Sequence, residues 1–172
     1  MKKVLLILGI IMSIILIINN KEEYILIPNE AIRVRVIANS NSEYDIKVKE
    51  ELKDKLNNYV NKLINNINNI DDAREAIKSN LNNIHNYVDK SLKKLNYSKS
   101  YSLNYGLNYF PEKIFKGIKY NSGLYESLVV TLGEGNGPNY WCVLYPPICL
   151  IDNNKKDVEY RSFIKDIILN YF

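Results

Sequence analysis

The spacing of apolar residues changes from a helical to an alternating pattern near residue 100, and this change constrains the fold most. Before it, apolar residues recur every three or four positions through residues 43–70 and again through 71–95, which predicts two amphipathic helices. After it, Tyr101–Tyr109 alternates without a break, with tyrosine and leucine on one face, which predicts a strand. The two consecutive helices are expected to form an αα-hairpin that packs on a sheet.

Four more stretches carry strand patterns. They are Ala31–Ala38, Ile114–Tyr120, Leu124–Leu132 and Tyr140–Tyr145. The last two are joined by a loop with three glycines in five residues, a composition that suits positive φ or close backbone approach. We expect them to form a β-hairpin with a long, mobile connection. Pro146 and Pro147 end the second strand because proline has no backbone N–H for a ladder.

A helical spacing over Val158–Tyr171 predicts a C-terminal helix. The expected fold class is α+β: a single domain over residues 31–172, with a largely antiparallel sheet and the αα-hairpin and C-terminal helix packed on one face of it. Residues 21–30 are expected to be a short linker.

The N-terminus has the form of an export signal. Lys2 and Lys3 precede a run from Val4 to Ile18 that is apolar apart from one glycine and one serine. Fifteen helical residues span about 23 Å, short of a hydrocarbon core of about 30 Å. No small-residue cleavage site follows, so residues 1–20 are expected to be either a signal peptide or a retained signal anchor. The lysines hold the N-terminus in the cytoplasm, so the rest of the chain is secreted, or anchored to the membrane by residues 4–18.

The segment Gly123–Asp152 gathers the rare residues of the chain: the only Trp, both Cys and four of the seven Gly. In an exported chain Cys142 and Cys149 are expected to form a disulfide, with two buried free thiols as the alternative. Catalysis by a cysteine would need the single His85, which lies beside an apolar helical stripe. The best carboxylate pair, Glu126 and Glu134, shows no sign of a tuned pKa. We therefore expect no catalytic residue.

The other site classes are weak. The glycine loop is followed by a strand, whereas phosphate-binding glycine motifs open a helix, so no nucleotide cofactor is expected. Two cysteines and one distant histidine match no common zinc pattern, so no metal is expected. The net charge of +4 is mild and the lysines are mixed with acidic residues, which argues against nucleic acid as a partner.

Arg33 and Arg35 share one face of their strand. We interpret that face as solvent-exposed, and the alternative is that the pair binds an acidic partner.

Two sequences carry a resemblance to a known family. AIRVRVIANSNSEYD and, later, GLYESLVVTLGEGNGPNYWCVLYPPICLID resemble stage II sporulation protein R of endospore-forming bacteria, over about residues 30–152. The chain departs from the family's pattern at Arg35, where His is frequent, at Asn41, where Asp is frequent, and at Tyr140, where a second Trp is frequent.

The resemblance implies a role in signalling. Members are exported from the forespore into the space between the two septal membranes. There they switch on a membrane-embedded aspartic protease of the mother cell, which cleaves the precursor of sigma factor E. The chain would be the ligand and not an enzyme, touching the membrane only through its N-terminal segment if that is uncleaved. The alternative is an exported hydrolase acting on peptide or cell wall.

We hypothesise that the receptor contacts the glycine loop, the tryptophan and the turn between the cysteines, with the two arginines and Glu126 as further candidates. The residues concerned are Arg33, Arg35, Glu126, Gly133, Glu134, Gly135, Gly137, Trp141, Pro146 and Pro147. The rival interpretation of Trp141 is that it is a core residue.

Overall fold

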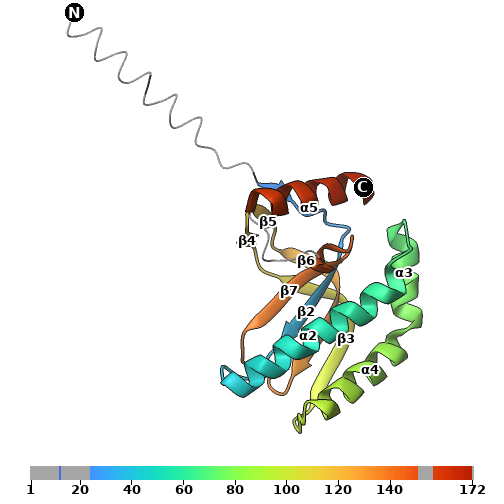
Figure 1. The fold of residues 1–172 in the computed structure, drawn as a ribbon, viewed down its shortest axis with the longest axis vertical. Coiled ribbons are helices and arrows are strands. Elements are labelled where there is room, and N and C mark those ends of the chain that lie inside the picture. The colour runs from blue at the N-terminus through green and yellow to red at the C-terminus, as the bar shows by residue number, and fades with distance from the viewer. Residues whose placement is uncertain (1–11, 13–23, 151–156, 172) are drawn as a thin grey trace, which may run out of the picture.

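The computed structural model describes residues 12, 24–150 and 157–171 (Figure 1). The predicted signal segment, Met12 apart, lies outside these residues. The elements are β1 (Ile25–Leu26), β2 (Ile32–Ile37), α2 (Glu43–Ile64), α3 (Ile70–Ser79), α4 (Leu81–Lys94), β3 (Tyr101–Phe110), β4 (Lys113–Phe115), β5 (Ile118–Tyr120), β6 (Gly123–Leu132), β7 (Asn139–Tyr145), the 3-10 turn η1 (Ile148–Leu150) and α5 (Asp157–Tyr171). None of the helices in this part of the chain has the length and apolarity needed to span a membrane.

A four-stranded sheet in the order β3-β6-β2-β7 forms the centre of the molecule. β2 runs parallel to β6 and antiparallel to β7, and β3 runs antiparallel to β6. Helices α2, α3 and α4 cover one face of this sheet (Figure 1). Apolar residues of β2, such as Val34 and Val36, are fully buried against Leu52 and Leu56 of α2 in the main core. The predicted α+β class and single domain are confirmed.

The predicted αα-hairpin has one continuous arm and one broken arm. α2 forms the first arm, and its N-terminus is capped by the Ser42 hydroxyl, which accepts a hydrogen bond from the Asp45 N–H at 3.1 Å. The second arm breaks at Asn80 into α3 and α4. The Asn80 side chain donates to the carbonyl of Ala76 at 2.9 Å, a local bond that competes with a continuous helix.

A second, smaller sheet and a second core lie at one end of the molecule. The small sheet has the order β1-β5-β4, and its strand β1 falls within residues 21–30. Helix α5 lies against this part of the fold and not beside the other helices (Figure 1). Tyr160 and Ile164 of α5 pack there against Ile118 of β5 and Val143 of β7. Most of the apolar stripe of α5 is therefore buried in this second core and not beside the other helices, while Tyr171 at its end packs against Tyr145 of the main core.

Strands β6 and β7 do not form the expected hairpin, because β2 lies between them. The glycine loop instead carries the chain across the end of β2. Its backbone is tied there by hydrogen bonds from Gly137 N to Ala38 O at 2.9 Å, from Ala38 N to Pro138 O at 3.2 Å and from Asn136 N to Asn39 O at 3.0 Å. The loop is thus an anchored bridge and not the mobile connection that the glycines suggested.

The geometry of the loop requires its glycines, as Gly133 and Gly137 show. Gly133 has a φ of +51°, a conformation that residues with a side chain rarely adopt. A Cβ atom on Gly137 would lie 2.3 Å from the backbone oxygen of Ser40, so the loop could not approach β2 as closely with any other residue.

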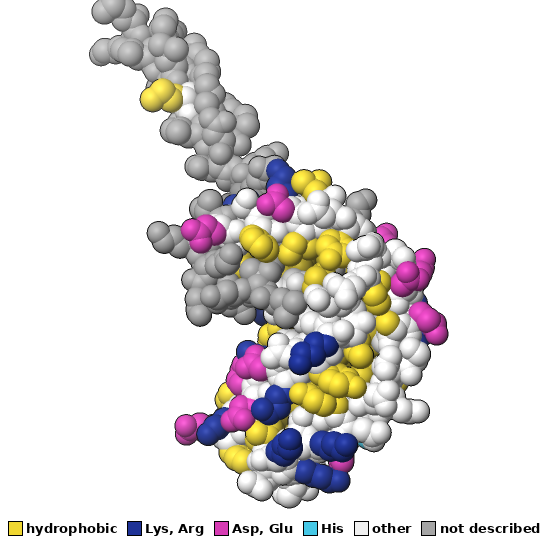
Figure 2. Space-filling view, turned by 45° about the vertical axis from the view of Figure 1, so that its right-hand side comes forward, with side chains coloured by type: hydrophobic (Ala, Val, Ile, Leu, Met, Phe, Trp, Pro, Cys, Tyr) yellow, Lys and Arg dark blue, Asp and Glu magenta, His cyan; other side chains and the backbone are white. Residues whose placement is uncertain are grey.

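Charge is unevenly distributed over the surface. On the face in Figure 2, hydrophobic side chains show in separate groups, and most of the lysine and arginine side chains gather in the lower part, together with several acidic ones.

Candidate functional site

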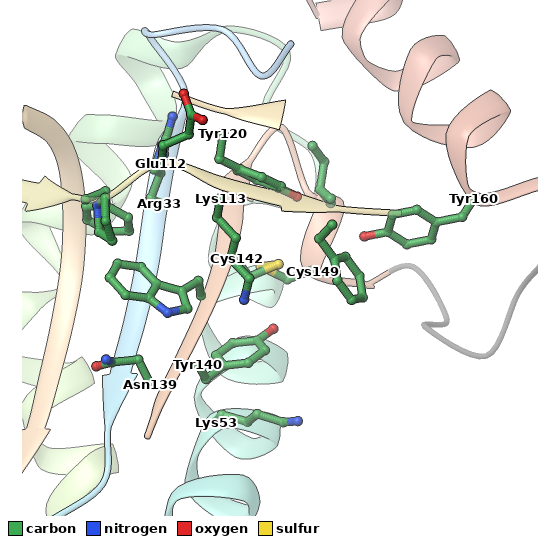
Figure 3. A pocket seen from close by; sticks show the side chains of 15 residues that line it. Arg33, Lys53, Glu112, Lys113, Tyr120, Asn139, Tyr140, Cys142, Cys149 and Tyr160 are labelled. Atoms are coloured by element: carbon green, nitrogen blue, oxygen red, sulfur yellow. A yellow bond between two sulfur atoms is a disulfide. The ribbon is translucent and has the colours of Figure 1, made fainter. Parts of the chain in front are cut away.

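A pocket of about 290 Å³ lies between the main sheet, the small sheet and α5. Figure 3 shows Arg33 and Tyr160 on opposite sides of it, with Lys53 and Tyr140 at one end and Glu112 and Tyr120 at the other. Its walls are rich in aromatic side chains. These are Phe110, Phe115, Tyr120, Tyr140, Trp141 and Tyr160.

The pocket follows the outer edge of β7. Four consecutive residues of this strand, Asn139 to Cys142, line it. Because successive side chains of a strand point to opposite faces, a pocket lined by four in a row reaches round the edge of this strand from one face to the other. β7 is the last strand of its sheet, so this edge has no strand partner among the described residues.

Arg33 is buried at the pocket, with only 2% of its surface exposed. The interpretation of a solvent-exposed arginine face is therefore wrong for this residue. Its guanidinium carbon lies 3.3 Å from the ring centroid of Tyr125, 5.5 Å from that of Phe110 and 5.9 Å from that of Tyr120. The alternation of the strand could not reveal this, because the covering rings come from segments about 80–90 residues further along the chain.

Arg33 keeps unused hydrogen-bonding capacity. Its Nε and Nη2 atoms are buried and have no hydrogen-bond partner among the residues that the structure describes. Burial lowers the pKa of Arg33, and the nearby Tyr125 and Tyr120 partly oppose that change. Arginine remains charged in proteins, so the pocket contains a buried cation with two free donors.

Trp141 lies half-buried between a cation and a ring. The Arg35 guanidinium carbon is 4.3 Å from the Trp141 ring centroid, and the Phe110 ring meets it at 4.9 Å and 67°. Arg35 Nε also donates to Asn139 Oδ1 at 3.0 Å. These contacts fix the indole at the pocket wall, so Trp141 is neither a fully buried core residue nor a free surface residue.

The remaining charges of the pocket are mostly positive. Lys53 and Lys113 line it beside Arg33, and Glu112 is the one acidic residue of the described lining. The Glu112 carboxylate already accepts an ion pair from Lys119 Nζ at 3.0 Å. Burial raises the pKa of Tyr140 to about 12, so this hydroxyl stays protonated at neutral pH.

The structure brings only some of the predicted site residues together. This pocket is lined by four of them, Arg33, Trp141, Cys142 and Cys149. Arg35 contacts the pocket wall through Trp141. Glu126 lies on the helix-covered face, where it accepts a hydrogen bond from Arg74 Nε at 2.8 Å and another from Tyr105 at 2.9 Å.

The other predicted residues lie at the two ends of β7. At one end, the loop exposes the side chain of Glu134, while Gly133, Gly135 and Gly137 serve its path across β2. At the other end, Pro146 is buried and Pro147 is half-buried in the turn after the strand.

The two cysteines form the disulfide that the sequence predicts, Cys142–Cys149. It ties the edge of β7 to the turn that follows, and Cys149 Sγ lies 2.8 Å from the carbonyl oxygen of Val143. The disulfide therefore shapes one wall of the pocket.

Replacing both cysteines with serine should lower the free energy of unfolding by about 2 kcal/mol, because the short loop gains entropy when unfolded. Urea unfolding of the double variant, beside wild type with and without reductant, measures this. Reductant should shift wild type toward the variant and leave the variant unchanged. An equal effect of reductant on both proteins would contradict the assignment of a disulfide between Cys142 and Cys149.

The fold separates the residue pairs that catalysis would need. His85 lies exposed on α4 and contacts Tyr101 of the edge strand β3, with ring centroids 5.2 Å apart. The cysteines belong to the opposite edge of the sheet and are joined to each other. Glu126 and Glu134 are separated by about 20 Å of strand. In the part of the chain that the structure describes, no three His, Cys, Asp or Glu side chains come together as a metal site.

Sequence reasoning missed most of the aromatic and basic lining of the pocket. The missed residues are Lys53, Phe110, Lys113, Phe115, Tyr120, Tyr140 and Tyr160. They come from α2, β3, β4, β5, β7 and α5, so no local motif unites them. The one available signal was the density of aromatic residues between Phe110 and Tyr120.

Comparison with known proteins gives one family and one curated relative. The family described as stage II sporulation protein R matches residues 28–155. Stage II sporulation protein R of Bacillus subtilis (strain 168) is 34% identical over 133 residues, which are 77% of this chain and 59% of that protein. The chain thus aligns with less than two thirds of the relative's length. No solved structure gives a significant match.

Proposed function

Because the chain belongs to the stage II sporulation protein R family, we propose that it is an exported sporulation signal that activates a membrane-embedded aspartic protease of the mother cell. The activated protease would then cleave the precursor of sigma factor E. The observation that carries this proposal beyond the family is the pocket at the edge of β7. It offers shape, charge and aromatic surface to a partner without any assembled set of reacting groups among the described residues.

The composition of the pocket supports a protein partner. Tryptophan, tyrosine and arginine are the side chains most enriched at the energetically dominant positions of protein interfaces. Here Trp141, Tyr140 and Arg33 stand within one pocket on a sheet that α2 supports from behind. Such a rigid anchor lowers the entropic cost of binding.

Activation needs no chemistry from this chain. A ligand that binds the active state of the protease more tightly than the inactive state shifts the population toward the active state. Moving an equilibrium from about 1:99 to 99:1 requires a roughly 10⁴-fold preference for the active state. A single well-packed interface can supply such a preference.

We propose that the chain acts outside the forespore cytoplasm, in the space between the septal membranes. The N-terminal residues 1–20 have the form of an export signal, and the Cys142–Cys149 disulfide is typical of proteins that function outside the reducing cytoplasm.

The hydrolase alternative gains no support from the arrangement of the described residues. His85 and the cysteines lie at opposite edges of the sheet, and Glu126 is paired with Arg74.

The test is a reconstitution in cells that do not sporulate. The full chain, the candidate protease and the sigma-factor precursor are produced together, and a blot measures the shortened sigma factor. We expect processing that depends on this chain and that survives His85→Ala. Failure to process, with all three proteins made and this chain exported, would contradict the proposal.

A matched pair of variants locates the contact. Trp141→Ala should reduce processing at least about tenfold, since interface tryptophans commonly contribute more than 1.4 kcal/mol. Tyr44→Ala, which removes an exposed aromatic of α2 outside the pocket, should process like wild type. Equal processing by the two variants would show that the protease contacts a surface outside the pocket.

A further inference from the structure

We propose that the pocket at the edge of β7 binds a carboxylate, held side-on by Nε and Nη2 of Arg33, and that this carboxylate is an acidic side chain in an extended segment of the partner. The inference rests on the proposed function only in taking the partner to be a protein. The carboxylate site itself follows from the residues of the pocket.

The two unpartnered atoms of Arg33 identify the geometry of the ligand. Nε and Nη2 lie on the same edge of the planar guanidinium group. A carboxylate that meets this edge accepts two parallel N–H···O bonds, one to each oxygen. Both donors are buried and unsatisfied within the described chain, and the side chain is only 2% exposed. The fold therefore presents a preformed half of a bidentate pair.

The aromatic contacts of Arg33 hold the guanidinium, while its Nε and Nη2 stay buried without a hydrogen-bond partner among the described residues. Tyr125 lies against the guanidinium group, with the carbon 3.3 Å from the ring centroid. Tyr125 also supports the charge through a side-chain hydrogen bond, but Nε and Nη2 have no hydrogen-bond partner among the described residues. A buried cation whose N–H groups lack acceptors costs folding free energy. A bound carboxylate supplies the negative charge and the hydrogen-bond acceptors that the described residues do not provide.

The charge of the lining favours an anion over a neutral group. Lys53 and Lys113 join Arg33 in the pocket. Glu112 is the one acidic residue of the described lining, and its carboxylate is engaged by Lys119 at 3.0 Å. Lys53 is itself paired with Glu50. An incoming carboxylate therefore meets Arg33 and Lys113 as the cations of the lining with no ion pair to an acidic residue among the described residues.

The size and position of the pocket favour one side chain of an extended segment. About 290 Å³ lies just below the range of about 300–1,000 Å³ typical of sites for whole small molecules. The pocket runs along the open edge of β7, where an extended segment can add to a sheet and place alternate side chains in pockets.

The single tryptophan provides the measurement. Trp141 lines the pocket, so its fluorescence in the full chain, purified in a mild non-ionic detergent, reports occupancy. Four probes are titrated: the tripeptide Gly-Glu-Gly blocked at both ends, its blocked Gly-Gln-Gly counterpart, acetylated triglycine with a free C-terminal carboxylate, and inorganic phosphate. We expect a saturable response to the glutamate probe. Each of the other three should bind at least about tenfold more weakly.

Variants test the role of Arg33. Arg33→Met should lose the response to the glutamate probe, while Arg33→Lys, which keeps the charge but not the paired donors, should weaken it at least about tenfold. Lys90→Met removes one positive charge from an exposed position of α4 and should bind like wild type.

Several outcomes would overturn the proposal. They are no response to the glutamate probe, equal binding of the glutamate and glutamine probes, tighter binding of phosphate or of the C-terminal carboxylate, or an unchanged response in Arg33→Met. The comparison of probes uses only wild type, so it decides the matter even where a variant fails to fold. No protease or sigma factor is present in this binding experiment. A negative result would therefore contradict the carboxylate site and not the proposed activation of the protease, which the reconstitution tests separately.

Discussion

Gly137→Ala is expected to lower the free energy of unfolding by about 3 kcal/mol, because the new methyl group has no space beside β2. Its Cβ would lie 2.3 Å from the backbone oxygen of Ser40 and 2.8 Å from the Cβ of Ala38. Backbone atoms cannot rotate away as a flexible side chain can. The loop must therefore lift from the end of β2, which breaks the bond from Gly137 N to Ala38 O and the bond from Ala38 N to Pro138 O.

Gly106→Ala is the matched control for this substitution. A Cβ on Gly106 would lie 3.7 Å from Asn104 Oδ1, an ordinary contact, so this variant should remain within about 0.5 kcal/mol of wild type. Urea unfolding of both variants measures the difference, with an unchanged m-value showing that the unfolded state is the same. Equal stability of the two variants would show that the loop is not held against β2.

The glycine loop also positions the pocket. β7 begins at Asn139, directly after the loop, and residues 139–142 form the pocket edge. A loop lifted from β2 would move these residues, so Gly137→Ala should also weaken the response of Trp141 to the glutamate probe. The glycines thus serve the site by fixing the start of β7 and not by touching a partner.

Local pattern was enough to predict most elements and not enough to predict how the strands pair. The alternation of Tyr101–Tyr109 appears as β3, and the spacing near the C-terminus appears as α5. The pairing of β2 with both β6 and β7 joins segments roughly 100 residues apart, and nothing local encodes it. Neighbouring strands joined by a glycine loop suggested a hairpin, whereas the fully buried apolar residues of β2 require a central position.

The same limit applies to the site. Trp141 and both cysteines were named as candidates because they are rare in the sequence, and Arg33 was named only in the alternative to a solvent-exposed arginine face. The rings that bury Arg33 could not be assigned, since Phe110, Tyr120 and Tyr125 reach it only after β3, β5 and β6 have folded beside β2. A charged residue on an alternating strand looks solvent-exposed until its covering partners are known.

Asp45→Asn is expected to destabilise the protein by about 2 kcal/mol at neutral pH, because Asp45 is a buried carboxylate that joins α2 to the end of β2. Only 1% of its surface is exposed. It accepts hydrogen bonds from Ser40 Oγ at 2.6 Å and Asn39 Nδ2 at 2.7 Å, and Lys99 Nζ lies at 3.2 Å. An amide at this position would turn a donor toward groups that are themselves donors.

The lowered pKa of Asp45 determines in which direction its stabilising effect changes with pH. Hydrogen bonds from Ser40 and Asn39, assisted by Lys99 and Ser42 and opposed by burial, lower the pKa of Asp45 to about 2. An unfolded aspartate has a pKa of about 3.9, so the folded state binds its proton less readily. The stabilisation is therefore complete above about pH 5 and is lost as the pH falls through 4 toward 2.

The measurement is the difference in unfolding free energy between wild type and Asp45→Asn, taken by urea unfolding from pH 7 to the lowest pH at which both proteins fold. The difference should be about 2 kcal/mol at pH 7 and should shrink steadily below about pH 4. Asp54→Asn, at an exposed position of the same helix, should differ from wild type by less than about 0.5 kcal/mol throughout. A difference for Asp45→Asn that stays constant with pH would mean that the amide costs packing alone and that the carboxylate's charge does not stabilise the junction between α2 and β2.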